Sequence, residues 1–313
     1  MEAVLTITLN PAIDKNFMVD RLVPDHKLRC ENPRVDPGGG GVNVARAINR
    51  LGGRAVAMVV SGGRNGKYLT DMLGEQGLET LCIDAGVETR ENITISETAS
   101  NKQYRLVMDG PSMGKDIQDS ILSTLQSLDP FPGIVVASGS LPPGTPEDFF
   151  ARIGAIVSQK KSKYILDTSG KALEAGAGQG VYLLKPNLRE LSILSGREEL
   201  VLDQVDDAAE VLIKKGIAQV VVVSLGPGGA MLVHKDGYRH IPAPTVPKKS
   251  TVGAGDSMVG GMVHAMQMGL GLDEVVMMGV ACGTAATMNE GTQLFKREDA
   301  ERLFNWIRKQ RTA

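Results

Sequence analysis

Short apolar runs alternate along the chain with segments in which apolar residues recur at helical spacing. The runs have the length of strands and lie at residues 4–9, 55–60, 133–138, 164–169, 181–186 and 219–224. The helical segments lie between them, at residues 41–53, 116–128, 146–159 and 205–216. Alternation of this kind predicts a mostly parallel sheet covered by helices. The unbroken valines at 220–223 are typical of a strand buried on both faces.

Two regions depart from this alternation. Residues 14–35 have no helical period and carry a basic cluster, and residues 90–108 alternate between polar and apolar positions around a polar turn at Ser100 and Asn101. We expect antiparallel strands inserted into the parallel framework, with segments within about 12–36 and 90–109 forming a small β lid over the carboxyl edge of the main sheet.

The remainder of the chain fits one domain. Residues 230–241 predict a hairpin with Asp236 and Gly237 as its two-residue turn. The chain ends in two helical patterns, at 275–291 and 297–310. Because no repeat, low-complexity tract or long linker interrupts the pattern, we expect a single domain over residues 1–313.

Composition narrows the class of partner. The formal net charge of −2 gives no reason to expect nucleic acid or an anionic membrane as the main partner. Three widely spaced cysteines without CxxC spacing are typical of reduced thiols in a cytoplasmic protein. The first residues have the pattern of a strand rather than a signal peptide, and no apolar run approaches the ~20 residues of a membrane helix.

The stretch STVGAGDSMVGG, residues 250–261, combines a glycine turn, a helix start and one acidic residue. Gly253 and Gly255 allow backbone amides to point into a concavity, and a helix from about Asp256 would add its positive end, so the pattern indicates an anion site. If the anion is a phosphoryl group in transfer, Asp256 can accept the proton of the attacking hydroxyl. The helix end would keep Asp256 ionised and weakly basic. The alternative is an aspartate helix cap after a tight turn.

Four consecutive glycines at 38–41 precede Asn43. They would let the backbone approach a ligand closely, with Asn43 bonding hydroxyl groups. The alternative is a flexible loop before an ordinary helix. A dinucleotide site is not favoured, because the GxGxxG spacing is absent and residues 31–37 form a poor strand.

Two further stretches lie at predicted strand ends. Lys185, Asn187 and Glu190 could hold a hydrated Mg²⁺ and a phosphate tail, whereas the alternative for Asn187 and Glu190 is a capping box. Ser224 and the glycines at 226, 228 and 229 follow another strand, where open α/β sheets bind ligands. Their alternative is a glycine-rich turn.

Taken together, these motifs resemble those of the ribokinase-like PfkB sugar kinases over essentially the whole chain. GGGGVNVARAINRLGG and STVGAGDSMVGGM are the two signatures, and TLNPAID, SGSLPPG and KPNLREL occur in the expected order. The resemblance implies a ribokinase-like three-layer α/β/α sandwich.

Within that family the sequence is most similar to the 6-phosphofructokinase branch. HKLRC followed by PGGGGVNVARAI in this chain matches the pattern GKLRC…PGGGGINVARAI of that branch, whereas 1-phosphofructokinases and tagatose-6-phosphate kinases usually carry Lys where this chain has Gly40. TLNPAID, however, is the form typical of those two relatives, so they remain as alternatives. The resemblance implies transfer of phosphate from ATP to the 1-hydroxyl of fructose 6-phosphate.

The resemblance also implies residue roles. Asp256 would be the base, and the anion hole would comprise Gly253, Ala254 and Gly255. The sugar phosphate would be bound by Asp14, Lys27, Arg29, Gly39, Gly40, Asn43, Arg90, Arg105 and Ser140, with Lys27 and Arg29 reaching the neighbour's site in a homodimer formed through the lid. ATP would be bound by Lys185, Asn187, Ser224, Gly226, Gly229, Thr251, Val280 and Thr284, and Glu190 would organise Mg²⁺. A monovalent cation, expected to be K⁺, would be held by Ser250, Val252, Ala286, Asn289 and Gly291.

Two hypotheses from other classes stand beside this one. A nicotinamide dehydrogenase would need a GxGxxG after its first strand, which the chain lacks. A non-catalytic sugar-phosphate sensor would not need Asp256, Asn187 and Glu190.

Overall fold

The computed structural model describes residues 2–100, 102–178, 180–291 and 293–310. Over these residues the main sheet has the strand order β13-β12-β11-β10-β9-β8-β1-β4-β5. The strands are β1 (Val4–Thr8), β4 (Val56–Ser61), β5 (Glu79–Asp84), β8 (Ile134–Ser138), β9 (Lys163–Asp167), β10 (Val181–Leu184), β11 (Val220–Ser224), β12 (Ala230–His234) and β13 (Gly237–Ile241). Every pair from β5 to β11 is parallel, and β12 and β13 are antiparallel. The predicted mostly parallel sheet is confirmed.

Helices cover both faces of this sheet. One face carries α1 (Gly40–Arg50), α2 (Gly63–Glu75), α8 (Ala254–Gln267), α9 (Leu272–Thr287) and α10 (Arg297–Gln310). The other carries α3 (Lys115–Ser127), α4 (Phe149–Gln159), α5 (Gly170–Gly176), α6 (Leu188–Ser195) and α7 (Val205–Lys214). Val220 and Val222 belong to the first core, and Val221 and Val223 to the second. β11 is therefore buried on both faces, and the architecture is the expected three-layer sandwich.

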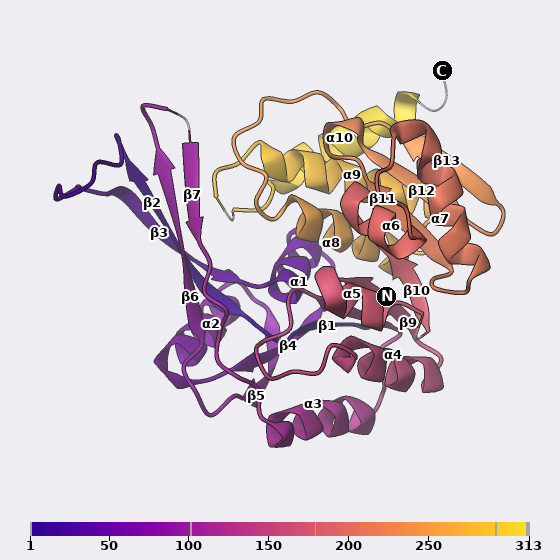
Figure 1. The fold of residues 1–313 in the computed structure, drawn as a ribbon, viewed down its shortest axis with the longest axis horizontal. Coiled ribbons are helices and arrows are strands. Elements are labelled where there is room, and N and C mark those ends of the chain that lie inside the picture. The colour runs from indigo at the N-terminus through magenta and orange to yellow at the C-terminus, as the bar shows by residue number, and fades with distance from the viewer. Residues whose placement is uncertain (1, 101, 179, 292, 311–313) are drawn as a thin grey trace.

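The lid is a second sheet of order β3-β2-β6-β7, formed by β2 (Ala12–Val19), β3 (Glu31–Gly38), β6 (Arg90–Glu97) and β7 (Lys102–Leu106). It stands apart from the layered body in Figure 1. The pairs β2–β3 and β6–β7 are antiparallel, but β2 and β6 are parallel, from Ala12 opposite Arg90 to Val19 opposite Glu97.

The prediction of a purely antiparallel lid was therefore wrong for its two central strands, β2 and β6. β2 and β6 follow β1 and β5, which leave the same edge of a parallel sheet, so both strands enter the lid in the same direction. The expectation that residues 31–37 form a poor strand was also wrong, since they lie in β3. β3 is an edge strand, where prolines are tolerated.

The predicted hairpin forms, but its turn is one residue earlier. His234 pairs with Gly237, so Lys235 and Asp236 are the two turn residues. The register buries Leu232 in one core and Val233 in the other. Burial of both faces of β12, rather than the turn preference of Asp236 and Gly237, sets the pairing register of the hairpin.

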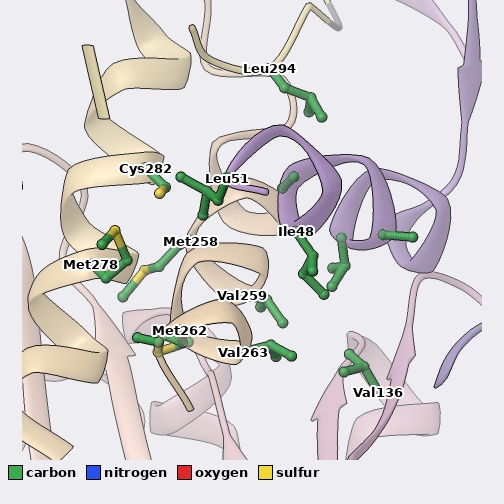
Figure 2. Close-up of a cluster of buried hydrophobic side chains, with 14 of the residues drawn as sticks. Ile48, Leu51, Val136, Met258, Val259, Met262, Val263, Met278, Cys282 and Leu294 are labelled. Atoms are coloured by element: carbon green, nitrogen blue, oxygen red, sulfur yellow. The ribbon is translucent and has the colours of Figure 1, made fainter. Parts of the chain in front are cut away.

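Helix α8 is packed tightly between α1 and α9. Its methionines 258, 262 and 266 are buried in the core. Figure 2 shows Met258 and Met262 on the side of α8 that faces Met278 of α9, and Val259 and Val263 on the side of Ile48 of α1. A Cβ atom on Gly261 would lie 2.7 Å from Sγ of Cys282, and one on Gly260 would collide with Ala47 of α1. α8 is therefore packed closely against both α1 and α9.

None of the described helices is both long and apolar enough to span a membrane.

Candidate active site

The chemistry-bearing residues gather where the carboxyl ends of the central strands meet the first turns of α1 and α8. Asp256 lies on the first turn of α8, which begins at Ala254, two residues earlier than expected. Gly253 precedes it with φ 73°, a conformation that favours glycine. Asn43 on the first turn of α1 donates a hydrogen bond from Nδ2 to Oδ2 of Asp256 at 2.9 Å. Two segments far apart in the sequence thus form one polar pair.

Asp256 is more basic than the sequence suggests. Burial raises its pKa to about 6, and the nearby Asp167 carboxylate adds to the rise, whereas the Asn43 hydrogen bond and Lys185 oppose it. The expectation of a weakly basic carboxylate was therefore wrong, because desolvation outweighs the helix end. At neutral pH Asp256 is mostly ionised and remains able to accept a proton.

The glycine run at 38–41 is packed closely against its surroundings. β3 ends at Gly38 and α1 begins at Gly40, which excludes a flexible loop. A Cβ atom on Gly40 would lie 2.6 Å from the backbone nitrogen of Gly139, and one on Gly41 would lie 2.6 Å from the carbonyl oxygen of Ile7. The glycines therefore let the lid strand and α1 pass directly over the ends of β1 and β8.

Asp14 lies on the lid strand β2, and a Cβ atom on Gly38 would collide with its carboxylate. Oδ1 of Asp14 accepts a hydrogen bond from Nδ2 of Asn92 at 2.8 Å, and burial raises the pKa of Asp14. Arg105 is exposed on β7 and lowers the pKa of Asp14 slightly, so its charge acts at this site.

Arg90 holds the base of the lid. Its guanidinium donates to the carbonyl oxygens of Asn10 at 2.9 Å, Pro11 at 3.4 Å and Met108 at 2.5 Å. Because a guanidinium has five N–H groups, two remain for a ligand. Arg90 and Ser140 line one hollow of about 500 Å³, and Ser140 Oγ accepts from Nδ2 of Asn10 at 3.2 Å.

Lys27 and Arg29 are not brought to this site within one chain. Both are exposed in the segment between β2 and β3, at the outer end of the lid (Figure 1).

Lys185 lies at the end of β10, surrounded by carboxylates. Its Nζ forms an ion pair with Asp167 at 3.1 Å, and its side chain is 8 % exposed. Burial lowers the pKa of Lys185, but Asp167, Glu190 and Asp256 raise it by more, so the ammonium stays charged. Nζ would lie 3.6 Å from a Cβ atom on Gly255, close to the glycine turn.

Asp167 was missed in the sequence. The available signal was its position at the carboxyl end of one predicted strand, beside the strand that ends at Lys185. Both strands were predicted, but their adjacency was not.

Asn187 and Glu190 form the capping box that was the structural alternative. Asn187 Oδ1 accepts from the Glu190 amide, and Glu190 Oε2 accepts from the Asn187 amide, both at 2.9 Å. Burial raises the pKa of Glu190. The capping box uses only one carboxylate oxygen of Glu190, since Oε1 makes neither of these bonds.

The donor set fits a hydrated Mg²⁺ better than a metal held by protein alone. Asp167, Glu190 and Asp256 all act on Lys185. Yet no three His, Cys, Asp or Glu side chains in the described part of the chain converge as a metal site. Mg²⁺ in kinases typically keeps several waters and binds one or two carboxylates plus substrate phosphates.

The other residues expected at the nucleotide site have varied surroundings. Ser224 ends β11 and donates from Oγ to the Pro186 carbonyl at 3.4 Å. Gly226 starts the short helix η2 (Gly226–Gly228), and Gly229 follows it with φ 89°. Thr251 is exposed, whereas Thr284 on α9 is half-buried. Val280 is 4 % exposed within the core, which leaves it little surface for a nucleotide.

The two segments expected to hold a monovalent cation lie side by side. The amides of Lys249 and Ser250 both donate to the carbonyl oxygen of Thr287. Ala286 already accepts from the amide of Asn289 at 3.1 Å, and Gly291 has φ 56°. These carbonyl-rich segments, which also include Val252, fit a cation bound by backbone oxygens, with one lone pair of Ala286 already used.

Comparison with known proteins agrees with this geometry. Residues 4–299 match the pfkB family of carbohydrate kinases. The chain is 38% identical to ATP-dependent 6-phosphofructokinase isozyme 2 of Escherichia coli over 312 residues, covering 98% of this chain and 99% of that protein. It is 35% identical to a 1-phosphofructokinase of Xanthomonas campestris over 266 residues, covering 84% of this chain and 83% of that protein.

A solved structure has the same fold. The crystal structure of phosphofructokinase-2 from E. coli in complex with potassium matches with a TM-score of 0.93 and 39% identity, covering 98% of this chain and 100% of that one. With a family match that spans nearly the whole sandwich and lid, the chain belongs to the pfkB family of carbohydrate kinases.

Proposed function

We propose that this protein transfers the γ-phosphate of ATP to the 1-hydroxyl of fructose 6-phosphate, giving fructose 1,6-bisphosphate. The observation that carries the proposal is the pairing of Asn43 with Asp256 directly after the glycine turn, which gives one basic carboxylate beside a helix N-terminus. Similarity to the 6-phosphofructokinase of E. coli supports the choice of sugar phosphate.

In the proposed reaction Asp256 orients the sugar hydroxyl and takes its proton as the bond to phosphorus forms. Its pKa of about 6 suits this role, because the carboxylate is ionised at neutral pH yet basic enough to accept the proton. The amides of Gly253, Ala254 and Gly255, at the positive end of α8, stabilise the charge of the phosphoryl group in transfer.

The nucleotide approaches from the side of β10 and β11. Lys185 supplies a fixed positive charge for its phosphates, and Asn187, Ser224, Gly226, Gly229, Thr251 and Thr284 are the proposed contacts. Val280 is left out, because it is buried in the core. Mg²⁺, organised by Glu190, would neutralise phosphate charge. Potassium in the E. coli structure supports a K⁺ held by Ser250, Val252, Ala286, Asn289 and Gly291, where it would stabilise the turn that carries Asp256.

We place the sugar phosphate under the lid. Its hydroxyls would be bound by Asp14, Gly39, Gly40 and Asn43. The hollow that Arg90 and Ser140 line together supports a 6-phosphate site there. Arg105 adds positive charge at this side. Because Lys27 and Arg29 lie at the outer end of the lid, we propose a homodimer through the lids in which they reach the neighbour's site. The reaction would take place in the cytoplasm.

The second candidate is a 1-phosphofructokinase, or a tagatose-6-phosphate kinase, of the same family. Similarity to the X. campestris 1-phosphofructokinase favours it, together with Asn10 of the TLNPAID motif, which bonds Ser140 in the sugar hollow. Gly40 argues for the 6-phosphate, because the enzymes of the second candidate usually carry lysine at this position. A Cβ atom there would lie 2.6 Å from the backbone nitrogen of Gly139 in this chain.

An ADP-release assay with a panel of sugar phosphates tests the proposal. We expect kcat/KM for fructose 6-phosphate to exceed those for fructose 1-phosphate and tagatose 6-phosphate. A preference for fructose 1-phosphate would establish the second candidate. Absence of turnover with every sugar phosphate, despite binding of one of them, would indicate a sensor.

A further inference from the structure

A buried arginine, Arg46, lies one helical turn beyond Asn43 on α1 and is 2% exposed. Its Nη1 donates to Oδ1 of Asn43 at 3.1 Å and to the carbonyl oxygen of Pro37 at 2.9 Å, and its Nε donates to Oε1 of Gln76 at 2.9 Å. Burial lowers its pKa to about 10, with Asp36 opposing the change, so the guanidinium is charged at neutral pH.

The guanidinium dictates the orientation of the Asn43 amide. Arginine has donors and no acceptor, so only the amide oxygen of Asn43 can face it. The amide NH₂ group must then face Asp256, whose ionised carboxylate has only acceptors. A flipped amide would place oxygen against carboxylate and NH₂ against guanidinium, and both contacts would be unfavourable.

Arg46 is itself fixed from the lid. Pro37 and Asp36 belong to β3, and Nη2 of Arg46 lies 3.6 Å from Oδ1 of Asp36. The same carboxylate oxygen bonds Arg34 at 2.7 Å. A continuous series of contacts therefore runs from the lid strand through Arg46 and Asn43 to Asp256.

We propose that Arg46 is a positioning residue, which holds the NH₂ group of Asn43 against Asp256 and links this orientation to the lid strand β3. The inference rests on the proposed function, in which Asp256 is the base. Arg46 acts through Asn43, and its Nη1 and Nε donors bond Asn43, Pro37 and Gln76.

The pH dependence of turnover reports on this orientation. The charged groups that act on Asp256 are Asp167 from β9, Asp14 from β2 and Lys185 beyond β10. All three remain when Arg46 is substituted. Loss of a hydrogen bond to the ionised carboxylate raises its pKa, and the acid limb of kcat/KM then moves to higher pH.

The experiment measures pH profiles for the wild type, Arg46→Met and Arg46→Lys, each also in an Asn43→Ala background. We expect the acid limb of Arg46→Met to move up by about one pH unit, the size expected for one hydrogen bond to a charged group. The KM for ATP should stay within about twofold. In Arg46→Lys the acid limb should lie between those of the wild type and Arg46→Met, because lysine keeps the charge but not the fork of donors.

The Asn43→Ala background separates positioning from a direct charge effect. If Arg46 acts through Asn43, its substitution causes no further shift once Asn43 is absent, whereas a charge effect would persist. Gln76→Ala is the matched control, since it removes the Nε partner and leaves both Nη1 contacts, and it should keep the wild-type profile.

An unshifted acid limb in a folded Arg46→Met variant overturns the inference, as does an equal shift with and without Asn43. If Arg46→Met does not fold, Arg46→Lys carries the test, and an unshifted limb there has the same meaning. If Asp256→Asn remained active, the proposed base would fail. If Asp256→Asn is inactive while the Arg46 profiles are unchanged, only the role of Arg46 fails.

Discussion

Asn43 and Asp256, 213 residues apart in the chain, meet through one hydrogen bond of 2.9 Å between the first turns of two helices. The bond opposes the effect of burial, yet the pKa of Asp256 still stands at about 6. Burial therefore dominates the proton affinity of the proposed base, and the Asn43 hydrogen bond moderates it.

A first prediction concerns the pH dependence of the wild type. Protonation removes the ability of Asp256 to act as a base, so kcat/KM should fall as pH drops through about 6 and should be fully developed above it. A steady-state pH profile checks this. An acid limb near pH 4, the ordinary range of an aspartate, would show that burial does not raise the pKa of the base.

A second prediction concerns Asp167. Its carboxylate raises the pKa of Asp256, so Asp167→Asn should lower that pKa and move the acid limb below the wild-type position. The shift has the opposite sign to that expected for Arg46→Met. The same pH profile measures it, and an upward shift would mean that Asp167 acts on Asp256 chiefly by holding Lys185.

The third prediction tests the packing of the glycine run. Gly41→Ala should destabilise the fold by about 1–3 kcal/mol, because the new Cβ would lie 2.6 Å from the carbonyl oxygen of Ile7. Gly74→Ala is the control, since a Cβ atom at Gly74 in α2 meets nothing within 4 Å. It should stabilise the fold by about 0.5–1 kcal/mol. Urea unfolding measures both, and equal effects would contradict the account of the run.

Some of the fold followed from the sequence and some did not. The four consecutive valines at 220–223 predicted a strand buried on both faces, because an apolar side chain points to each face in turn. The parallel pairing of β2 with β6 did not follow, since it depends on where β1 and β5 leave the main sheet. The turn at Lys235 and Asp236 was missed because burial of Leu232 and Val233 overrides local turn chemistry.

The site shows the same division. Asp256 and Asn43 lay in motifs, and their residue types indicated the chemistry. Asp167 and Arg46 act through contacts that strand order and helix packing create, and no short spacing marks them. Capping by Asn187 and Glu190 was visible as an alternative and is present in the structure.

The fourth prediction concerns Arg90. Arg90→Ala should raise the KM for the sugar phosphate far more than the KM for ATP, because Arg90 lines the hollow proposed for the sugar and holds the base of the lid. Initial rates with each substrate varied in turn provide the comparison. Equal increases in both KM values would count against a role for Arg90 in sugar-phosphate binding.

The last prediction concerns Asp256→Asn. The variant should fold, since asparagine can still accept the Asn43 hydrogen bond. Between the ordinary aspartate pKa of about 3.9 and about 6, folded Asp256 binds a proton that the unfolded chain has lost, so its ionisation reduces stability as pH rises through this range. Asp256→Asn should therefore be more stable than the wild type at pH 7, by about 1–3 kcal/mol, and thermal melting shows whether the fold is intact.

Single-turnover phosphoryl transfer by Asp256→Asn, with ATP and fructose 6-phosphate both at saturating concentration, is the direct test of Asp256 as the base. We expect binding of both substrates and a transfer rate about 10²–10⁴-fold below the wild type. A folded variant that transfers phosphate at close to the wild-type rate would show that Asp256 is not the base.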